Sequence, residues 1–183
     1  IGDHEGAITW LLKSEALFES LHNQARVAEI KFQTARALRA LGNKTRAAEV
    51  LGDALRSANA AGNESLAVRV EAFMAWIDVQ DGNSVDARRR LEQLVPRADN
   101  AEPEAQFAVR FALAKTLTEA EPARSVEILR ELAASLEKRS ASSAVADVYD
   151  ELSKALARQG LSEEALVYAQ RAYAATTQAK GGV

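Results

Sequence analysis

The chain has 183 residues, of which 48% are hydrophobic, 27% charged and only 5% aromatic, a balance that indicates a globular helical protein. Its 23 basic and 26 acidic side chains give a net charge of −3, which argues against a basic nucleic-acid-binding surface. It has no cysteine, which excludes disulfides, thiolate metal sites and cysteine nucleophiles, and no apolar run near the roughly 18 residues that span a bilayer.

The spacing of apolar residues predicts nine helices and no strand. We expect the first four over 3–23, 24–41, 45–60 and 64–80. The fifth begins at Ser84 and is expected to end or kink at Pro96, because proline inside a helix removes a hydrogen bond. The last four are expected over 103–119, 122–138, 143–159 and 162–179. In the final helix the residues expected to face the core are Ala165, Leu166, Ala169, Ala172 and Tyr173.

One spacing recurs through the chain: an anchor residue at a turn is followed five residues later by a small residue. The pairs are Gly2 and Ala7, Gly42 and Ala47, Gly82 and Ala87, Gly160 and Ala165, with Ala120 and Ser125 as the irregular copy. The steps between the anchors are 40, 40, 38 and 40 residues. A fixed period of this length is the signature of a repeat array.

Further small residues extend the pattern to both helices of each unit. Ala35, Ala75 and Ser153 each lie seven residues before an anchor, and Ala54 and Ala172 lie twelve residues after one. This arrangement resembles the tetratricopeptide repeat (TPR) family, especially its longer form of near 40 residues in bacterial regulatory proteins. The resemblance implies an all-α, right-handed solenoid of antiparallel helix pairs with about nine helices. Tyr149 matches the aromatic residue that the family places near the start of the first helix.

The phase of the repeats predicts a single TPR-like domain over 1–183 that begins with the second helix of a pair. An unpaired helix at 3–23 is followed by pairs at 24–61, 64–99, 103–138 and 143–179. Because terminal repeats usually need a polar cap, we expect that residues of a longer protein precede Ile1.

Catalytic and metal-binding patterns are weak, so we expect neither an enzyme nor a cofactor. His4 and His22 lie 18 residues apart at opposite ends of the first helix, too far apart to share a metal ion. No phosphate-binding loop and no nucleophile elbow is present in the sequence. The basic run 88–90 is expected to be a solvated face, and Trp10 is expected to lie in the core.

The TPR resemblance implies that the first helix of each pair lines a concave face, which makes its polar and aromatic side chains the binding candidates. These are Gln33, Arg36, Arg39, Arg69, Trp76, Gln80, Arg110, Lys115, Asp147, Asp150, Lys154 and Arg158. Trp76 is the strongest candidate, because tryptophan and arginine are enriched at binding hot spots; the alternative is that it packs against the next pair.

One TPR subtype clamps a terminal carboxylate with lysine and asparagine. Here Arg36 and Lys154 fall at one matching position, but no asparagines accompany them, so that mode is not expected. Arginine on the early repeats and aspartate on the last imply a polarised groove, with a partly acidic peptide nearer the front.

Three functions remain open. The first is a protein-binding or peptide-binding module that contacts neither nucleic acid nor membrane. The second is a regulatory or ligand-sensing region of a larger bacterial signalling protein, such as a transcription regulator or diguanylate cyclase. The third is a homodimer formed through the terminal helices. A cytoplasmic location is expected, with the periplasm as the alternative.

Overall fold

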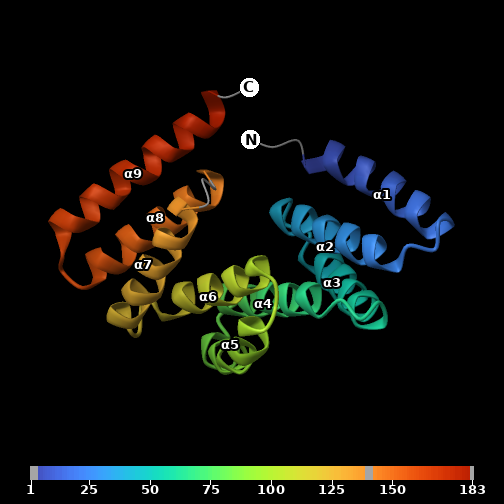
Figure 1. The fold of residues 1–183 in the computed structure, drawn as a ribbon, viewed down its shortest axis with the longest axis horizontal. Helices are drawn as coiled ribbons and strands as arrows, with labels where there is room; N and C mark the ends of the chain where they lie inside the picture. Colours follow the sequence, from blue (N-terminus) through green and yellow to red (C-terminus); the bar gives the residue numbers. More distant parts are fainter. Residues whose placement is uncertain (1–3, 139–141, 182–183) are drawn as a thin grey trace. The chain divides into compact units, whose positions relative to one another are not determined.

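The computed structural model describes residues 4–138 and 142–181, and within these ranges the chain forms nine α-helices and no strand (Figure 1). The helices are α1 (His4–Ser20), α2 (Gln24–Ala40), α3 (Lys44–Ala60), α4 (Glu64–Gln80), α5 (Ser84–Asp99), α6 (Pro103–Leu117), α7 (Pro122–Lys138), α8 (Ser142–Arg158) and α9 (Ser162–Gly181). This confirms the all-α prediction, and the bounds agree with the expected ones to within a few residues.

The fifth helix does not end at Pro96, so that part of the expectation is wrong. Helix α5 continues through this proline to Asp99. Proline lacks the amide hydrogen that would bond the preceding turn. Tertiary contacts hold the last turn in place. Ala98 is buried, and the Arg97 guanidinium binds Glu71 at 2.9 Å and Glu64 at 2.7 Å.

The turns after α2, α3, α4 and α8 each contain a glycine in the left-handed region. At Gly42, where φ is 79°, the amide donates to the carbonyl of Arg39 and closes the end of α2. The following Asn43 caps α3, because its side-chain oxygen accepts from the amide of Arg46 at 3.3 Å. The turn after α1 has the same form with His22 in the glycine position, at φ 52°.

The described residues divide into two compact units. The first comprises the described residues up to Met74 together with Pro96–Ala105. The second comprises Ala75–Val95 together with the described residues from Gln106 onward. Helices α4, α5 and α6 therefore contribute residues to both units.

In the first unit, α2 packs against both α1 and α3. The small residues of the repeat lie in this packing: Ala35 on α2 and Ala47 and Ala54 on α3 are no more than 1% exposed. Short side chains allow two helix axes to approach closely. The repeat spacing therefore marks the helix–helix contacts of this unit.

The second unit has a continuous apolar core built from α7, α8 and α9. Leu129, Val148, Leu152 and Leu156 are fully buried in it. The core is polar at the irregular repeat copy, where Ser125 replaces the usual alanine. The Ser125 hydroxyl donates to the carbonyl of Ala114 at 2.9 Å, and a neighbouring hydroxyl, that of Thr118, donates to the buried carboxylate of Glu151 at 3.0 Å. Serine is accepted here because its hydroxyl is hydrogen-bonded.

The terminal helices expose apolar side chains that were expected to face the core. Trp10 on α1 is 69% exposed, so its assignment to the core is wrong. On α9, Leu166 and Tyr173 are 60% and 74% exposed, and Ala169 is also exposed. In the described part of the chain, α1 packs on α2 and α9 packs on α8. An amphipathic pattern alone cannot tell a face that meets a neighbour from one that meets solvent.

Candidate partner-binding face

The first helix of each pair carries the predicted binding residues, and within each compact unit we call the side chains of these helices (α2, α4, α6 and α8) that are not fully buried the first-helix face of that unit. The candidates that are exposed are Arg36, Gln80, Asp147, Asp150, Lys154 and Arg158. The half-buried candidates are Gln33, Arg39, Arg69, Trp76, Arg110 and Lys115. In each compact unit, some of these side chains meet around aromatic rings.

In the first unit, the rings of Phe32 on α2 and Phe73 on α4 meet edge to face, with centroids 5.7 Å apart. The Arg69 guanidinium lies 5.4 Å from the centroid of Phe32, and the Arg36 guanidinium lies 5.9 Å from it. Both distances are in the range of cation–π attraction. The structure therefore brings Arg36 and Arg69 together across two consecutive first helices.

Arg69 is also committed to an ion pair. Its guanidinium donates to both carboxylate oxygens of Glu29, at 3.0 and 3.3 Å, and the same carboxylate accepts from Gln33 at 2.8 Å. A carboxylate bound by two parallel hydrogen bonds largely neutralises the guanidinium charge, so this arginine attracts a second anion only weakly. Arg69 is therefore not available to support the expected binding of an acidic peptide near the front of the array.

The second unit has a different cluster, in which one cation lies on two rings. The Lys115 ammonium is 5.1 Å from the ring centroid of Trp76 and 5.4 Å from that of Phe111. The ring of Phe107 stacks on Phe111, with centroids 5.3 Å apart and planes 15° apart. Both Trp76 and Lys115 were predicted site residues, and the structure places them in contact.

On α8 the predicted residues are paired with acids. Lys154 donates to Asp150 at 2.6 Å, and this hydrogen bond is the main cause that raises the pKa of Lys154 above its ordinary value. Arg158 donates to Glu119 at 2.6 Å. These exposed pairs contribute little to stability. They leave the α8 part of the first-helix face close to electrically balanced.

The phenylalanines of the first-helix face were missed by the search for polar candidates. Phe73 and Phe111 each lie nine residues before an anchor, as Gln33 does, and Phe107 and Arg69 each lie thirteen before one. Phe73, Phe107 and Phe111 are all half-buried. Comparing the residues at equivalent repeat positions would have identified them.

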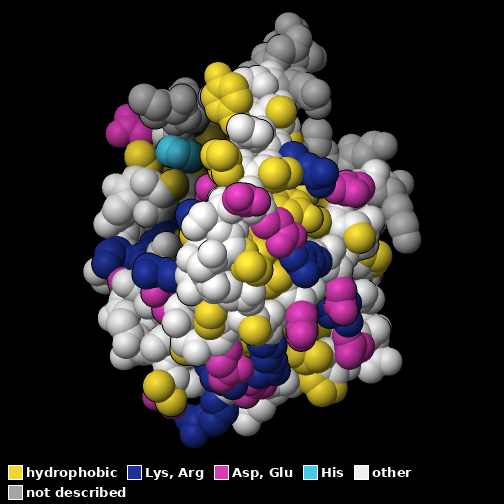
Figure 2. Space-filling model, turned by 90° about the vertical axis from the view of Figure 1, so that its left-hand side faces the viewer, with side chains coloured by type: hydrophobic (Ala, Val, Ile, Leu, Met, Phe, Trp, Pro, Cys, Tyr) yellow, Lys and Arg dark blue, Asp and Glu magenta, His cyan; other side chains and the backbone are white. Residues whose placement is uncertain are grey.

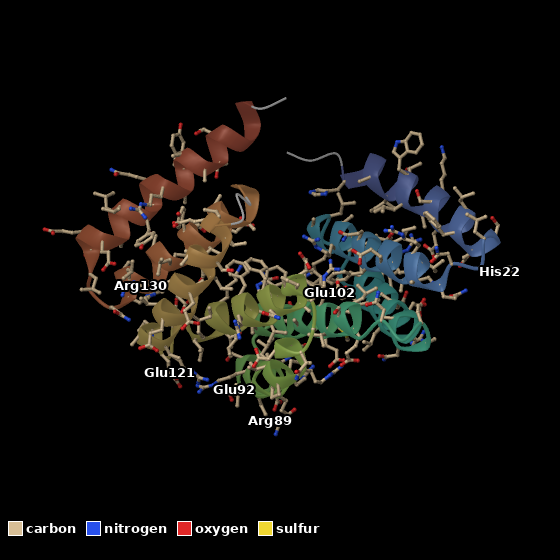
Figure 3. All side chains as sticks on the ribbon, in the orientation of Figure 1. His22, Arg89, Glu92, Glu102, Glu121 and Arg130 are labelled. Carbon is tan, nitrogen blue, oxygen red and sulfur yellow. The ribbon has the colours of Figure 1, made fainter. Side chains whose placement is uncertain are left out.

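Ion pairs occupy the second helices as well. In the basic run 88–90, Arg89 and Arg90 are exposed as expected, whereas Arg88 is not. Arg88 is half-buried and binds both Glu92 and Glu121. Figure 3 marks the positions of these two glutamates. The pKa of Arg88 is raised, chiefly by the hydrogen bond to Glu121. Arg90 binds Asp78 at 2.7 Å. Arg89 binds Asp86 at 2.8 Å, so each arginine of this run is paired with an acid and the run is not a basic patch. Figure 2 shows acidic and basic side chains interspersed on one face of the molecule.

The described residues offer no group of three or more His, Cys, Asp or Glu side chains that is placed to hold a metal ion. Within the same ranges, no helix has the length and apolar character needed to cross a membrane. What the first-helix face presents is aromatic surface with cations held against it, which suits recognition of another molecule by contact.

Comparison with known proteins yields structural similarity only. No protein-family model matches the sequence, and no curated protein matches it. A point-substituted form of the nearly identical TPR-like repeats of a putative kinesin light chain from Podosopora anserina aligns with a TM-score of 0.59 and 19% identity, over 99% of this chain and 90% of that one. A second structure of these TPR-like repeats aligns with a TM-score of 0.56 and 20% identity, over 97% of this chain and 89% of that one. The chain therefore has the TPR-like fold, an all-α solenoid of antiparallel helix pairs.

Proposed function

We propose that this chain is a non-enzymatic module that binds a protein or peptide on its first-helix face. The observation that supports this most directly is the cluster of Trp76, Phe107, Phe111 and Lys115, in which aromatic rings stay half-buried although apolar core is available nearby. Rings of this kind supply large contact area at low cost in side-chain entropy, and they are enriched where proteins bind one another.

Selection from a library of randomised displayed peptides, with the whole chain as target, tests this function. The affinity of a selected peptide is then measured by fluorescence anisotropy for the wild type, Trp76→Ala and Trp10→Ala. Trp10 is the matched control, because it is 69% exposed but lies on α1, outside the first-helix face. We expect Trp76→Ala to weaken binding about tenfold or more, the size of a hot-spot effect, and Trp10→Ala to leave it unchanged. Absence of enriched peptides, or equal loss in both variants, would contradict the proposal.

A second candidate function, self-association, is favoured by the exposed face of α1. Trp10 and Leu17 lie seven residues apart on this helix and are 69% and 57% exposed, so they share one helical face. Leu21, in the turn that follows, is 63% exposed. Light scattering over a concentration series tests this candidate, and Trp10→Ala should shift any dimer toward monomer. A monomer at every concentration would remove it. The alternative of a regulatory region in a larger signalling protein stays a prediction.

A further inference from the structure

The ammonium of Lys115 differs from three other cations of the first-helix face in what surrounds it. Arg69, Lys154 and Arg158 each have a carboxylate oxygen within 3.0 Å. The contacts found for Lys115 within residues 4–138 and 142–181 are with the rings of Trp76 and Phe111 and include no carboxylate. The two rings attract the Lys115 ammonium, but a ring is not a strong hydrogen-bond acceptor. The three N–H groups of this ammonium can therefore still donate to a ligand.

The rings also restrict where this ammonium can be. Lys115 is half-buried, with a ring of α4 and a ring of α6 each within 5.4 Å of its nitrogen, and all three residues belong to the same compact unit. A lysine held in this way has lost part of its side-chain freedom before any ligand arrives. Binding then has a smaller entropic cost.

The local charge is complementary to an acid. The stretch 105–118, which carries Lys115, contains no aspartate or glutamate. The one acid of the neighbouring stretch 75–80 is Asp78, and it is already bound to Arg90 at 2.7 Å. A carboxylate that reaches this cluster therefore meets positive charge and flat apolar surface together.

We propose that the cluster of Trp76, Phe111 and Lys115 recognises a peptide in which an aspartate or glutamate adjoins an apolar side chain. The ligand carboxylate accepts hydrogen bonds from the Lys115 ammonium, while the apolar side chain covers the rings. This inference rests on the proposed function and adds the chemical class of the partner. It also moves the acidic end of the ligand from the arginines of the early repeats, where it was expected, to α6.

The test uses peptides enriched from the displayed library on the wild-type chain. We expect the enriched sequences to carry an acid next to a leucine, phenylalanine or similar residue. Synthetic versions with each acid replaced by its amide should bind about tenfold more weakly or worse, because a hydrogen bond between charged partners is lost. Added salt should weaken the acidic peptide more than the amide peptide.

Three variants of the chain separate the role of this lysine from that of charge in general. Lys115→Met keeps the apolar stem and should lose the preference for acid over amide, while Lys115→Arg should retain most of it. Lys13→Met is the matched control, because that lysine also lies over a ring, 4.9 Å from the centroid of Trp10, but on α1 and outside the first-helix face. Circular dichroism of each variant confirms that it is folded.

The outcomes are distinguishable. Enriched peptides without acids, whose binding still needs Trp76, would overturn this inference and leave the proposed function standing. Acidic peptides that bind Lys115→Met as well as the wild type would do the same. If no peptide is enriched at all, both the proposed function and this inference fall.

Discussion

Two glycines provide a strict test of the structure, because the same substitution is expected to have opposite effects at the two positions. Gly42 ends α2 with φ at 79°, and no atom lies within 4 Å of the place where a Cβ would be added. Backbone conformation alone therefore sets the effect of Gly42→Ala. A residue with a Cβ costs roughly 1–2 kcal/mol in the left-handed region, and the stiffer unfolded chain offsets about 0.4–1 kcal/mol of this. We expect the free energy of unfolding to fall by about 1 kcal/mol.

Gly52 lies inside α3, where the backbone is helical. An added Cβ meets only the guanidinium of Arg56, at an ordinary contact distance of 3.5 Å. Alanine is favoured over glycine in a helix interior by about 1 kcal/mol. We therefore expect Gly52→Ala to raise the free energy of unfolding by about 0.5–1 kcal/mol.

Urea unfolding followed by far-UV circular dichroism, on the wild type and both variants, measures the two effects. The variants should differ by about 2 kcal/mol, or roughly 4–8 °C in melting temperature for a chain of this size. A neutral Gly42→Ala would show that the turn does not need a left-handed residue. A loss of stability in Gly52→Ala equal to that in Gly42→Ala would show that α3 is not a regular helix at that point.

Three further predictions concern burial and charge in the second unit. Leu152→Ala should lower the free energy of unfolding by about 2–5 kcal/mol, because Leu152 is fully buried. Leu166→Ala should lower it by less than half as much, because that side chain is 60% exposed. Equal losses in urea unfolding would contradict the assigned core. Burial, followed by the hydrogen bond to Glu137, raises the pKa of Tyr149. In a pH titration followed by phenolate absorbance, the transition that disappears in Tyr149→Phe should therefore have its midpoint above the usual phenol pKa of about 10. A midpoint at or below that value would refute the assignment. Hydrogen bonds from two arginines, chiefly Arg88, lower the pKa of Glu92 in the folded state. The stability that Glu92 contributes should therefore be present above the unfolded-state pKa of about 4.3 and be lost as the pH falls through the lowered pKa of the folded state. A difference in stability between wild type and Glu92→Gln that did not shrink over this pH range would count against the pairing.

The helices were predictable because each carries its own local signals. The bounds of α4 were predicted to the residue, since Gly62 and Gly82 stand in the turns on either side of it. The turn after α1 follows the same geometry without a glycine, because His22 adopts the left-handed conformation there. Pro96 misled the prediction, because the penalty of a proline is local while the burial of Ala98 and the ion pairs of Arg97 come from other helices.

For the candidate binding residues, the sequence predicted the helix on which each one lies but not its contacts. The repeat period assigned Arg69, Trp76 and Lys115 to the first helices, and the structure places all three there. The period could not indicate that Arg69 binds Glu29 on another helix while Lys115 lies on two rings. Charge partners of this kind come from helices 26 to 40 residues apart in the chain, and their geometry depends on how neighbouring helices pack.

The sequence by itself determined the periodic part of this protein: the helices, their order, their turns and the small residues that let neighbours approach. These follow from backbone conformation and from the spacing of apolar side chains, both of which act over a few residues. Only the tertiary structure decided which faces are covered and which charges are already paired. The exposure of Trp10 and the position of Lys115 over the ring of Trp76 are results of that kind, because burial and side-chain contacts are set by atoms distant in sequence.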